Sequence, residues 1–166
     1  MVWRSAAVLL LDADGRYVDA DERALELLGV ATVDELRASP PETFQATPPD
    51  PEADAAFRAA IVDARFKGLI GEGALKRRDG ELVRVRTAII PEPGGGFRAL
   101  LYPVERPTSD LTPRVYKIAD VLGEWRVAER RLVEIDAATD EGRRITAEVE
   151  QLREQYHVLF ERSFSS

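Results

Sequence analysis

The pattern of apolar and polar residues divides the chain near residue 110. Up to that point, short apolar runs and alternating stretches are separated by turns rich in glycine and proline, which is typical of short strands and helices. Beyond it, apolar residues recur at helical spacing with few turn signals. The pattern therefore predicts a compact domain followed by a long helical extension.

Five stretches of the compact domain are predicted to be strands. Asp-Gly pairs at 14–15 and 79–80 are strong hairpin signals, and each lies between two such stretches. In chain order, the predicted strands cover residues 6–11, 16–18, 69–77, 81–90 and 97–104. Because these strands are consecutive or joined by hairpins, we expect them to form an antiparallel sheet.

Three helices are predicted between the second and third strands. The first is expected to begin at an N-cap, Asp19, and to end at Gly29. The second begins at Thr32 and ends near Ala38, and the third covers residues 51–67. This order of strands and helices favours the α+β class, with one antiparallel sheet and helices on one face.

The stretch Asp110-Leu111-Thr112-Pro113 is predicted to start the extension. Thr112 is a good N-cap, and Pro113 suits the first helical position. A continuous helix over residues 113–162 would be roughly 75 Å long, which no monomer of this size can bury along its length. Its apolar seam therefore predicts a coiled-coil homodimer, for which a parallel arrangement is one hypothesis and the sequence does not fix the direction. The seam residues are Ile118, Leu122, Trp125, Leu132, Ile145, Val149, Leu152, Tyr156 and Leu159.

The seam is irregular at residues 129–142, where the alternation of three- and four-residue steps is broken. One interpretation is a switch between two registers, and another is a passive stalk with a harmless irregularity. In a third interpretation, the helix turns at residues 138–142, where Thr139 or Asp140 caps a second helix and the extension becomes a hairpin.

Composition excludes several classes of function. The chain has 166 residues, a net charge of −7, no cysteine and one histidine. The negative charge argues against a nucleic acid or an anionic membrane as the main partner. Disulfides and cysteine- or histidine-based metal sites are excluded within one chain. No apolar run reaches the length of a membrane span, so we expect a cytoplasmic protein, and the excess of arginine and alanine suggests a bacterial source.

No catalytic constellation is evident, so we expect no enzymatic activity. His157 is the only histidine, and a position near the end of a helical stalk is poor for a catalytic base or a phosphoacceptor. The glycines at 94–96 lack the Lys-Ser/Thr of a phosphate-binding loop and precede a strand.

Several local strings, in this order and spacing, resemble the PAS sensory domain over about residues 5–113. They are Leu-Asp-Ala-Asp-Gly-Arg-Tyr-Val-Asp-Ala at 11–20, Ala-Leu-Glu-Leu-Leu-Gly at 24–29, Lys-Arg-Arg-Asp-Gly-Glu at 76–81 and Asp-Leu-Thr at 110–112. Asp21 departs from the family, in which many members have asparagine. The resemblance implies a five-stranded antiparallel sheet with the two N-terminal strands in its middle. It also implies helices that enclose a small pocket on one face.

The resemblance also limits the ligands. Photoreceptors of this family that form a cysteine adduct are excluded by the absence of cysteine, and the helix at 51–67 has no histidine to ligate haem. We expect no cofactor, although a non-covalent flavin or a small metabolite is compatible with the sequence. The residues expected around the pocket are Phe57, Ile61, Val85, Ile89 and Leu101, which would otherwise form a packed core. Arg58, Arg65, Arg84 and Arg86 are candidates for binding a carboxylate, but we expect them on solvated faces.

We therefore expect a sensory module with a PAS-like domain at 1–109, a signalling helix at 110–162 and the beginning of a further domain at 163–166. Asp110, Leu111 and Thr112 would form the relay junction. The helix would carry the signal in a homodimer to an output domain elsewhere in a longer protein, of the histidine kinase (two-component) or diguanylate cyclase type. The alternative is a ligand-free interaction or dimerisation module.

Overall fold

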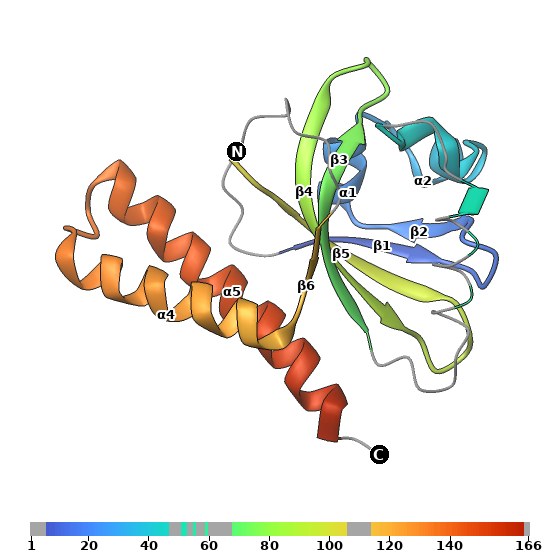
Figure 1. Ribbon diagram of the computed structural model, residues 1–166. Helices are drawn as coiled ribbons and strands as arrows, with labels where there is room; N and C mark the ends of the chain where they lie inside the picture. Colours follow the sequence, from blue (N-terminus) through green and yellow to red (C-terminus); the bar gives the residue numbers. More distant parts are fainter. Residues whose placement is uncertain are drawn as a thin grey trace.

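The fold is α+β and is built on one antiparallel sheet (Figure 1). The computed structural model describes residues 6–46, 51, 52, 55, 59, 68–105 and 114–164. Its elements are β1 (Ala7–Leu11), β2 (Tyr17–Ala20), α1 (Glu22–Leu28), α2 (Val33–Arg37), the 3-10 helix η1 (Pro41–Phe44), β3 (Leu69–Lys76), β4 (Leu82–Pro91), β5 (Phe97–Pro103), β6 (Arg114–Tyr116), α4 (Ile118–Glu134) and α5 (Asp140–Phe164). None of the helices in this described part is long and apolar enough to cross a membrane.

The sheet has six strands, in the order β2-β1-β5-β4-β3-β6, and not the predicted five. All five predicted strands are present, with bounds shifted by no more than two residues. The expectation that both N-terminal strands lie in the middle is wrong for β2, which forms an edge. β1 lies inside the sheet because it pairs with β5 as well as with β2.

The sixth strand replaces the first turn of the predicted helix. β6 pairs with β3, and Tyr116 lies opposite Ile70. α4 begins only at Ile118, where the Asp120 carboxylate accepts a hydrogen bond from the backbone N–H of Lys117 at 2.8 Å. The prediction of a helix from residue 113 is therefore wrong, because pairing with the edge of β3 satisfies the backbone at residues 114–116. The predicted relay junction, Asp110, Leu111 and Thr112, lies outside the described residues.

The two short helices follow their capping signals with one correction. The N-cap of α1 is Asp21 and not Asp19, because β2 continues to Ala20. Gly29 ends α1 with a φ of 69°, in the left-handed region that favours glycine. Thr32 caps α2 by accepting the Glu35 N–H at 3.1 Å, as predicted.

Helices cover both faces of the sheet, so the prediction of helices on one face is wrong. α1, α2 and η1 bury one set of apolar side chains, which includes Leu28, Phe44 and Leu101. The other face packs against α4 and α5, and this second core includes Ile70 and Ile145. Figure 1 shows the α4–α5 pair on the side of the sheet opposite α1 and α2.

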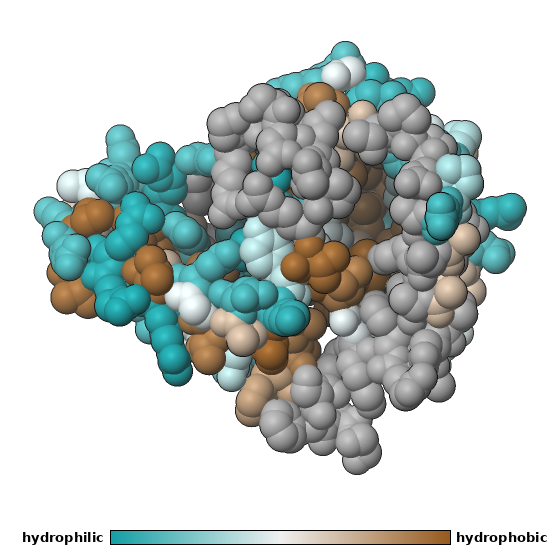
Figure 2. Space-filling model, in the orientation of Figure 1, coloured by the Kyte–Doolittle hydropathy of each residue, from teal (hydrophilic) through white to brown (hydrophobic). Residues whose placement is uncertain are grey.

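The extension is a helical hairpin and not the predicted continuous helix. α4 ends at Glu134, and α5 starts at Asp140 and runs antiparallel to it (Figure 1). Thr139 specifies the turn, because its hydroxyl accepts the Gly142 N–H at 3.0 Å and donates to the Asp136 carbonyl at 2.7 Å. This is the third of the predicted interpretations. Figure 2 shows hydrophilic residues over much of the hairpin, with apolar residues among them.

The predicted seam is used inside one chain. Ile145, Val149 and Leu152 on α5 are buried in the core between the hairpin and the sheet. Trp125 on α4 packs on Tyr156 of α5, with ring centroids 5.6 Å apart. The remaining seam residues, Ile118, Leu122, Leu132 and Leu159, are partly buried. The apolar periodicity therefore indicated a buried face correctly, but its partner in the structure is the chain's own sheet.

Candidate functional site

The predicted ligand pocket is described only in part. Val85 and Leu101 are 2% and 3% exposed and belong to the core under α1 and α2. Ile89 is partly buried, and Phe57 and Ile61 lie outside the described residues. The described side chains on this face pack against one another, so the prediction of an open pocket here stays a prediction.

The opposite face of the sheet carries a buried polar cluster. Its members are Glu72 on β3, Arg84 and Arg86 on β4, and Gln155 on α5, and each is at most 4% exposed. The expectation that Arg84 and Arg86 are solvated is wrong. Alternation along β4 placed both arginines on the face opposite Val85, as predicted, but the α4–α5 hairpin covers that face.

Glu72 is the centre of this cluster on the sheet. Its carboxylate accepts a hydrogen bond from Arg84 Nε at 2.7 Å and another from the Tyr116 hydroxyl at 2.7 Å. Arg86 Nη2 lies 3.6 Å from the same carboxylate, and its guanidinium lies 4.2 Å from the centre of the Tyr116 ring. A fully buried carboxylate is thus held by two cations and a hydroxyl, as buried charges require.

Arg86 connects the sheet to both helices of the hairpin. Its Nη2 lies 2.8 Å from the Glu124 carboxylate of α4, and its Nη1 donates to the Gln155 side-chain oxygen of α5 at 3.3 Å. Its Nε is buried and has no hydrogen-bond partner among the described residues. One side chain of β4 therefore contacts four other elements, which are β3, β6, α4 and α5.

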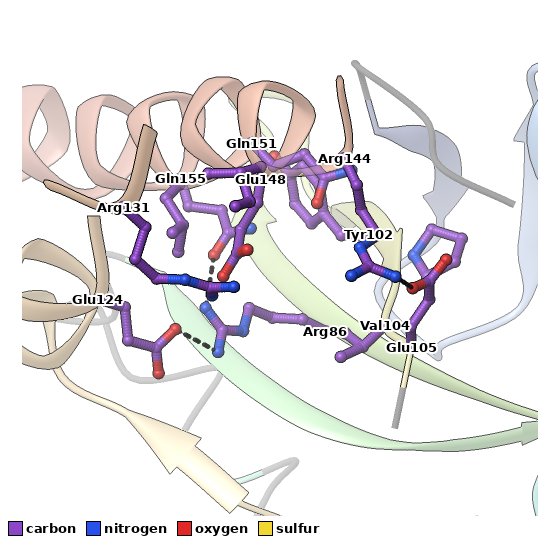
Figure 3. Close-up of a pocket in the computed structure, with 13 residues that line it drawn as sticks. Arg86, Tyr102, Val104, Glu105, Glu124, Arg131, Arg144, Glu148, Gln151 and Gln155 are labelled. Atoms are coloured by element: carbon purple, nitrogen blue, oxygen red, sulfur yellow. Dashed lines mark hydrogen bonds and ion pairs between the residues drawn. The ribbon is translucent and has the colours of Figure 1, made fainter. Parts of the chain in front are cut away.

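A cavity of about 330 Å³ lies beside Arg86, between β4, the end of β5 and the hairpin (Figure 3). Tyr102 lines it from β5, and burial, followed by the Glu154 carboxylate, raises the pKa of the Tyr102 phenol. Its hydroxyl therefore stays protonated. The charged and amide side chains around the cavity are Arg86, Glu105, Glu124, Arg131, Arg144, Glu148, Gln151 and Gln155.

The chemistry available here is recognition by charge and hydrogen bonding. Among the described residues, no group of His, Cys, Asp and Glu side chains is arranged to hold a metal ion. His157 is exposed and lies beside the Trp125 ring, with centroids 6.2 Å apart, away from the cavity lining. The cavity can offer guanidinium donors, amides and carboxylates to a small polar molecule.

Part of this cluster could have been predicted from the sequence by combining the strand register with the positions of the charged residues. The Asp79-Gly80 turn sets the register of β3 and β4, and that register places Glu72 directly opposite Arg86. Glu72 is the one acidic residue in these two strands, and an acid directly opposite a basic residue indicates a cross-strand ion pair. Glu124 and Gln155 could not be found in this way, because their approach depends on how the hairpin packs.

The fold is similar to that of solved PAS and LOV domains. Neither the protein-family models nor the curated proteins gave a match to the sequence. The Rhodobacter sphaeroides LOV protein is 16% identical, with a TM-score of 0.53 over 95% of this chain and 91% of that chain. The RsLOV d2 variant is 18% identical, with a TM-score of 0.54 over 95% of this chain and 85% of that chain.

A domain of a sensory box sensor histidine kinase/response regulator from Geobacter sulfurreducens is 23% identical, with a TM-score of 0.49 over 58% of this chain and 82% of that chain. The two LOV structures match 95% of the chain, so their likeness includes the C-terminal helices. The resemblance to PAS domains is thus confirmed at the level of the fold: this chain has the PAS/LOV fold.

Proposed function

We propose that this chain is a PAS-type sensory module without enzymatic activity and that the α4–α5 hairpin relays its signal. The PAS/LOV fold supports the sensory part of the proposal. The relay rests on one observation, which is that Arg86 of β4 binds Glu124 of α4 and Gln155 of α5. A change in the sheet that moves this side chain must change how the hairpin docks.

The polar character of this contact makes it suitable for a relay. Apolar packing tolerates small shifts, whereas a buried charge that loses its partner is destabilised by about 3–5 kcal/mol. The Arg86 side chain is 5% exposed, so Glu124 and Gln155 are its partners on the hairpin while the hairpin is docked. The interface therefore favours two distinct arrangements, docked and released.

Hydrogen exchange of the whole chain tests the relay. We expect Arg86→Met to raise amide exchange in α4 and α5 while β1 and α1 keep their protection. Arg98→Met is the matched control, because Arg98 lies on β5 with a side chain 48% exposed and forms a surface pair with Glu92. If exchange in the hairpin does not change, or rises equally in every element, Arg86 is not the link between sheet and hairpin.

The homodimer, the cytoplasmic location and the output domain belong to the same proposal. A second candidate function, a ligand-free dimerisation module, is favoured by exposed valines on α4, since Val127 and Val133 are 48% and 88% exposed. Native mass spectrometry separates the two. A dimer with additional mass on each subunit supports the sensor, and a dimer of bare chains supports the dimerisation module. A bare monomer contradicts dimerisation in both.

A further inference from the structure

The cavity beside Arg86 has the size of a small-ligand site. Its volume of about 330 Å³ falls at the lower end of the range for such sites. It lies on the hairpin side of the sheet, whereas the pocket predicted from the sequence lies on the side of α1 and α2. The cavity and the predicted pocket are therefore separate sites. The kind of ligand that the cavity beside Arg86 can bind depends on the residues that line it.

Three guanidinium groups from three elements line the cavity: Arg86 from β4, Arg131 from α4 and Arg144 from α5. Figure 3 shows the Arg131 side chain pointing toward that of Arg86. Arg131 is 3.8 Å from Glu141, and Arg144 is 3.3 Å from Glu105, both in half-exposed pairs. Because such surface pairs contribute little, both guanidinium groups can turn to a bound anion at small cost.

Arg86 adds a donor that already lacks an acceptor. Its side chain is 5% exposed, and its Nε has no partner in the described part of the chain. A buried donor without an acceptor is unfavourable. This Nε atom is shielded from solvent, but the guanidinium group as a whole lines the cavity, and a carboxylate matches a planar guanidinium best.

Carboxylates balance these cations. Glu105, Glu124 and Glu148 line the same cavity, so its ionised lining is close to neutral. A dianion would leave its second charge beside these carboxylates, and a simple cation would meet the arginines. A molecule with one carboxylate and one ammonium group satisfies both kinds of residue. We propose that this cavity binds a small zwitterion, a free amino acid, with its carboxylate at Arg131 and Arg86 and its ammonium group at Glu148.

A ligand at this place would contact the sheet and both helices at once. Since it binds only when these elements are together, it would stabilise the docked hairpin. This regulatory role deepens the proposed function and rests on it, whereas the binding itself does not. An amino acid would then be the signal, and hairpin docking the response.

Calorimetric titration of the full chain with the proteinogenic amino acids tests the site, with succinate and putrescine as probes that carry one kind of charge. We expect one or a few amino acids to bind and neither probe to do so. Arg131→Met should weaken binding about tenfold or more, as expected for loss of a charge-assisted contact. Arg130→Met is the matched control, because Arg130 is the neighbouring arginine of α4 and lies outside this cavity.

Three results would overturn the proposal: no amino acid binds, succinate binds in their place, or Arg130→Met weakens binding as much as Arg131→Met. Hydrogen exchange of the unliganded Arg131→Met variant should match that of the unaltered chain, which would show that the hairpin is still docked. The test of Arg86→Met needs no ligand. Calorimetry therefore tests the binding site, hydrogen exchange of Arg86→Met tests the relay, and either proposal can fail without the other.

Discussion

Arg84 of β4 donates a hydrogen bond from Nε to Glu72 of β3 at 2.7 Å, and the two side chains are only 2% and 0% exposed. The pair lies under the helical hairpin, where the Arg86 and Gln155 side chains are also buried beside an apolar core. A buried ion pair is weak evidence for stability, since apolar residues of the same volume often do as well. The pair does fix the positions of the two side chains relative to each other, because a buried charge that loses its partner is strongly destabilising.

The first prediction concerns that carboxylate. Glu72→Ala leaves Arg84 and Arg86 buried with less opposite charge, so we expect the free energy of unfolding to fall by about 3–5 kcal/mol in urea titrations. Glu81→Ala is the control, because Glu81 is 67% exposed and lies 3.4 Å from Arg77 in a surface pair. We expect that variant to lose less than about 1 kcal/mol. Equal losses in the two variants would show that the Glu72 cluster is hydrated in solution.

The second prediction concerns Asp21, the residue that departs from the asparagine common in PAS domains. Its Oδ1 accepts the Ala24 N–H at 2.8 Å and the Val8 N–H at 3.0 Å, so it caps α1 and ties it to β1. Asparagine keeps that oxygen, and we expect Asp21→Asn to change the free energy of unfolding by less than about 0.5 kcal/mol. Asp21→Ala removes both bonds and should be destabilising by about 1–2 kcal/mol.

Asp19→Ala is the control for this cap. Among the described residues, the Asp19 side chain accepts a hydrogen bond from its own neighbour, the N–H of Ala20, at 2.9 Å, and it is exposed. We expect almost no loss of stability on its removal. A larger loss of stability for Asp19→Ala than for Asp21→Ala would show that Asp19 is the N-cap of the first helix, as the sequence pattern suggested.

These two aspartates show how far sequence reasoning reached. Strands and turns were predictable because alternation and Asp-Gly pairs are local signals, and their bounds agree closely with the structure. Asp19 and Asp21 are both good caps, and only the length of β2 decides between them. Where two local signals compete, the tertiary structure selects one.

The candidate site was harder to predict for a different reason. The sequence correctly placed Arg86 opposite the apolar face of β4, and solvent was the simplest environment for it. The α4–α5 hairpin occupies that place, and it comes from residues more than thirty positions away, with the Arg86–Gln155 contact spanning 69. No local pattern reports such a contact. The apolar seam was recognised because its periodicity is a local signal, whereas its packing against the sheet is not.

The third prediction is a loss of stability at alkaline pH. Burial, followed by the Glu42 carboxylate, raises the pKa of Tyr17 from 10.0 to about 12. The folded state thus holds the proton more tightly than the unfolded state, so the associated stability is present below pH 10 and is lost as the pH rises through 12. A shift of this size corresponds to roughly 2–3 kcal/mol.

Urea unfolding at pH 8 and pH 11 measures this effect. In Tyr17→Phe the ring remains against Phe44, 5.8 Å away between centroids, but the ionisable hydroxyl is gone. We expect a smaller loss between the two pH values in this variant than in the unaltered chain, with the buried Tyr102 accounting for part of the remainder. Identical losses would rule out Tyr17 as a source.

The last prediction concerns the turn of the hairpin. A Cβ at residue 142 would collide with the carbonyl oxygen of Asp136 and lie 2.7 Å from Ala137 Cα. Gly142→Ala must therefore open the turn between α4 and α5, and we expect a loss of about 1–3 kcal/mol, as for overpacked sites. Gly123→Ala is the matched control in α4, where no atom lies within 4 Å of the added Cβ. There alanine should stabilise the helix by up to about 1 kcal/mol.

Opening this turn also tests the coiled-coil dimer expected from the sequence. Once α5 leaves the sheet, Ile145, Val149 and Leu152 lose their buried contacts and need another apolar surface. A straightened helix would offer them the same seam on a second copy of the chain. We therefore expect light scattering to show a larger dimer fraction for Gly142→Ala than for Gly123→Ala. If both variants have the same mass as the unaltered chain, the seam serves only the intramolecular hairpin, and a relay through helix pairing is excluded.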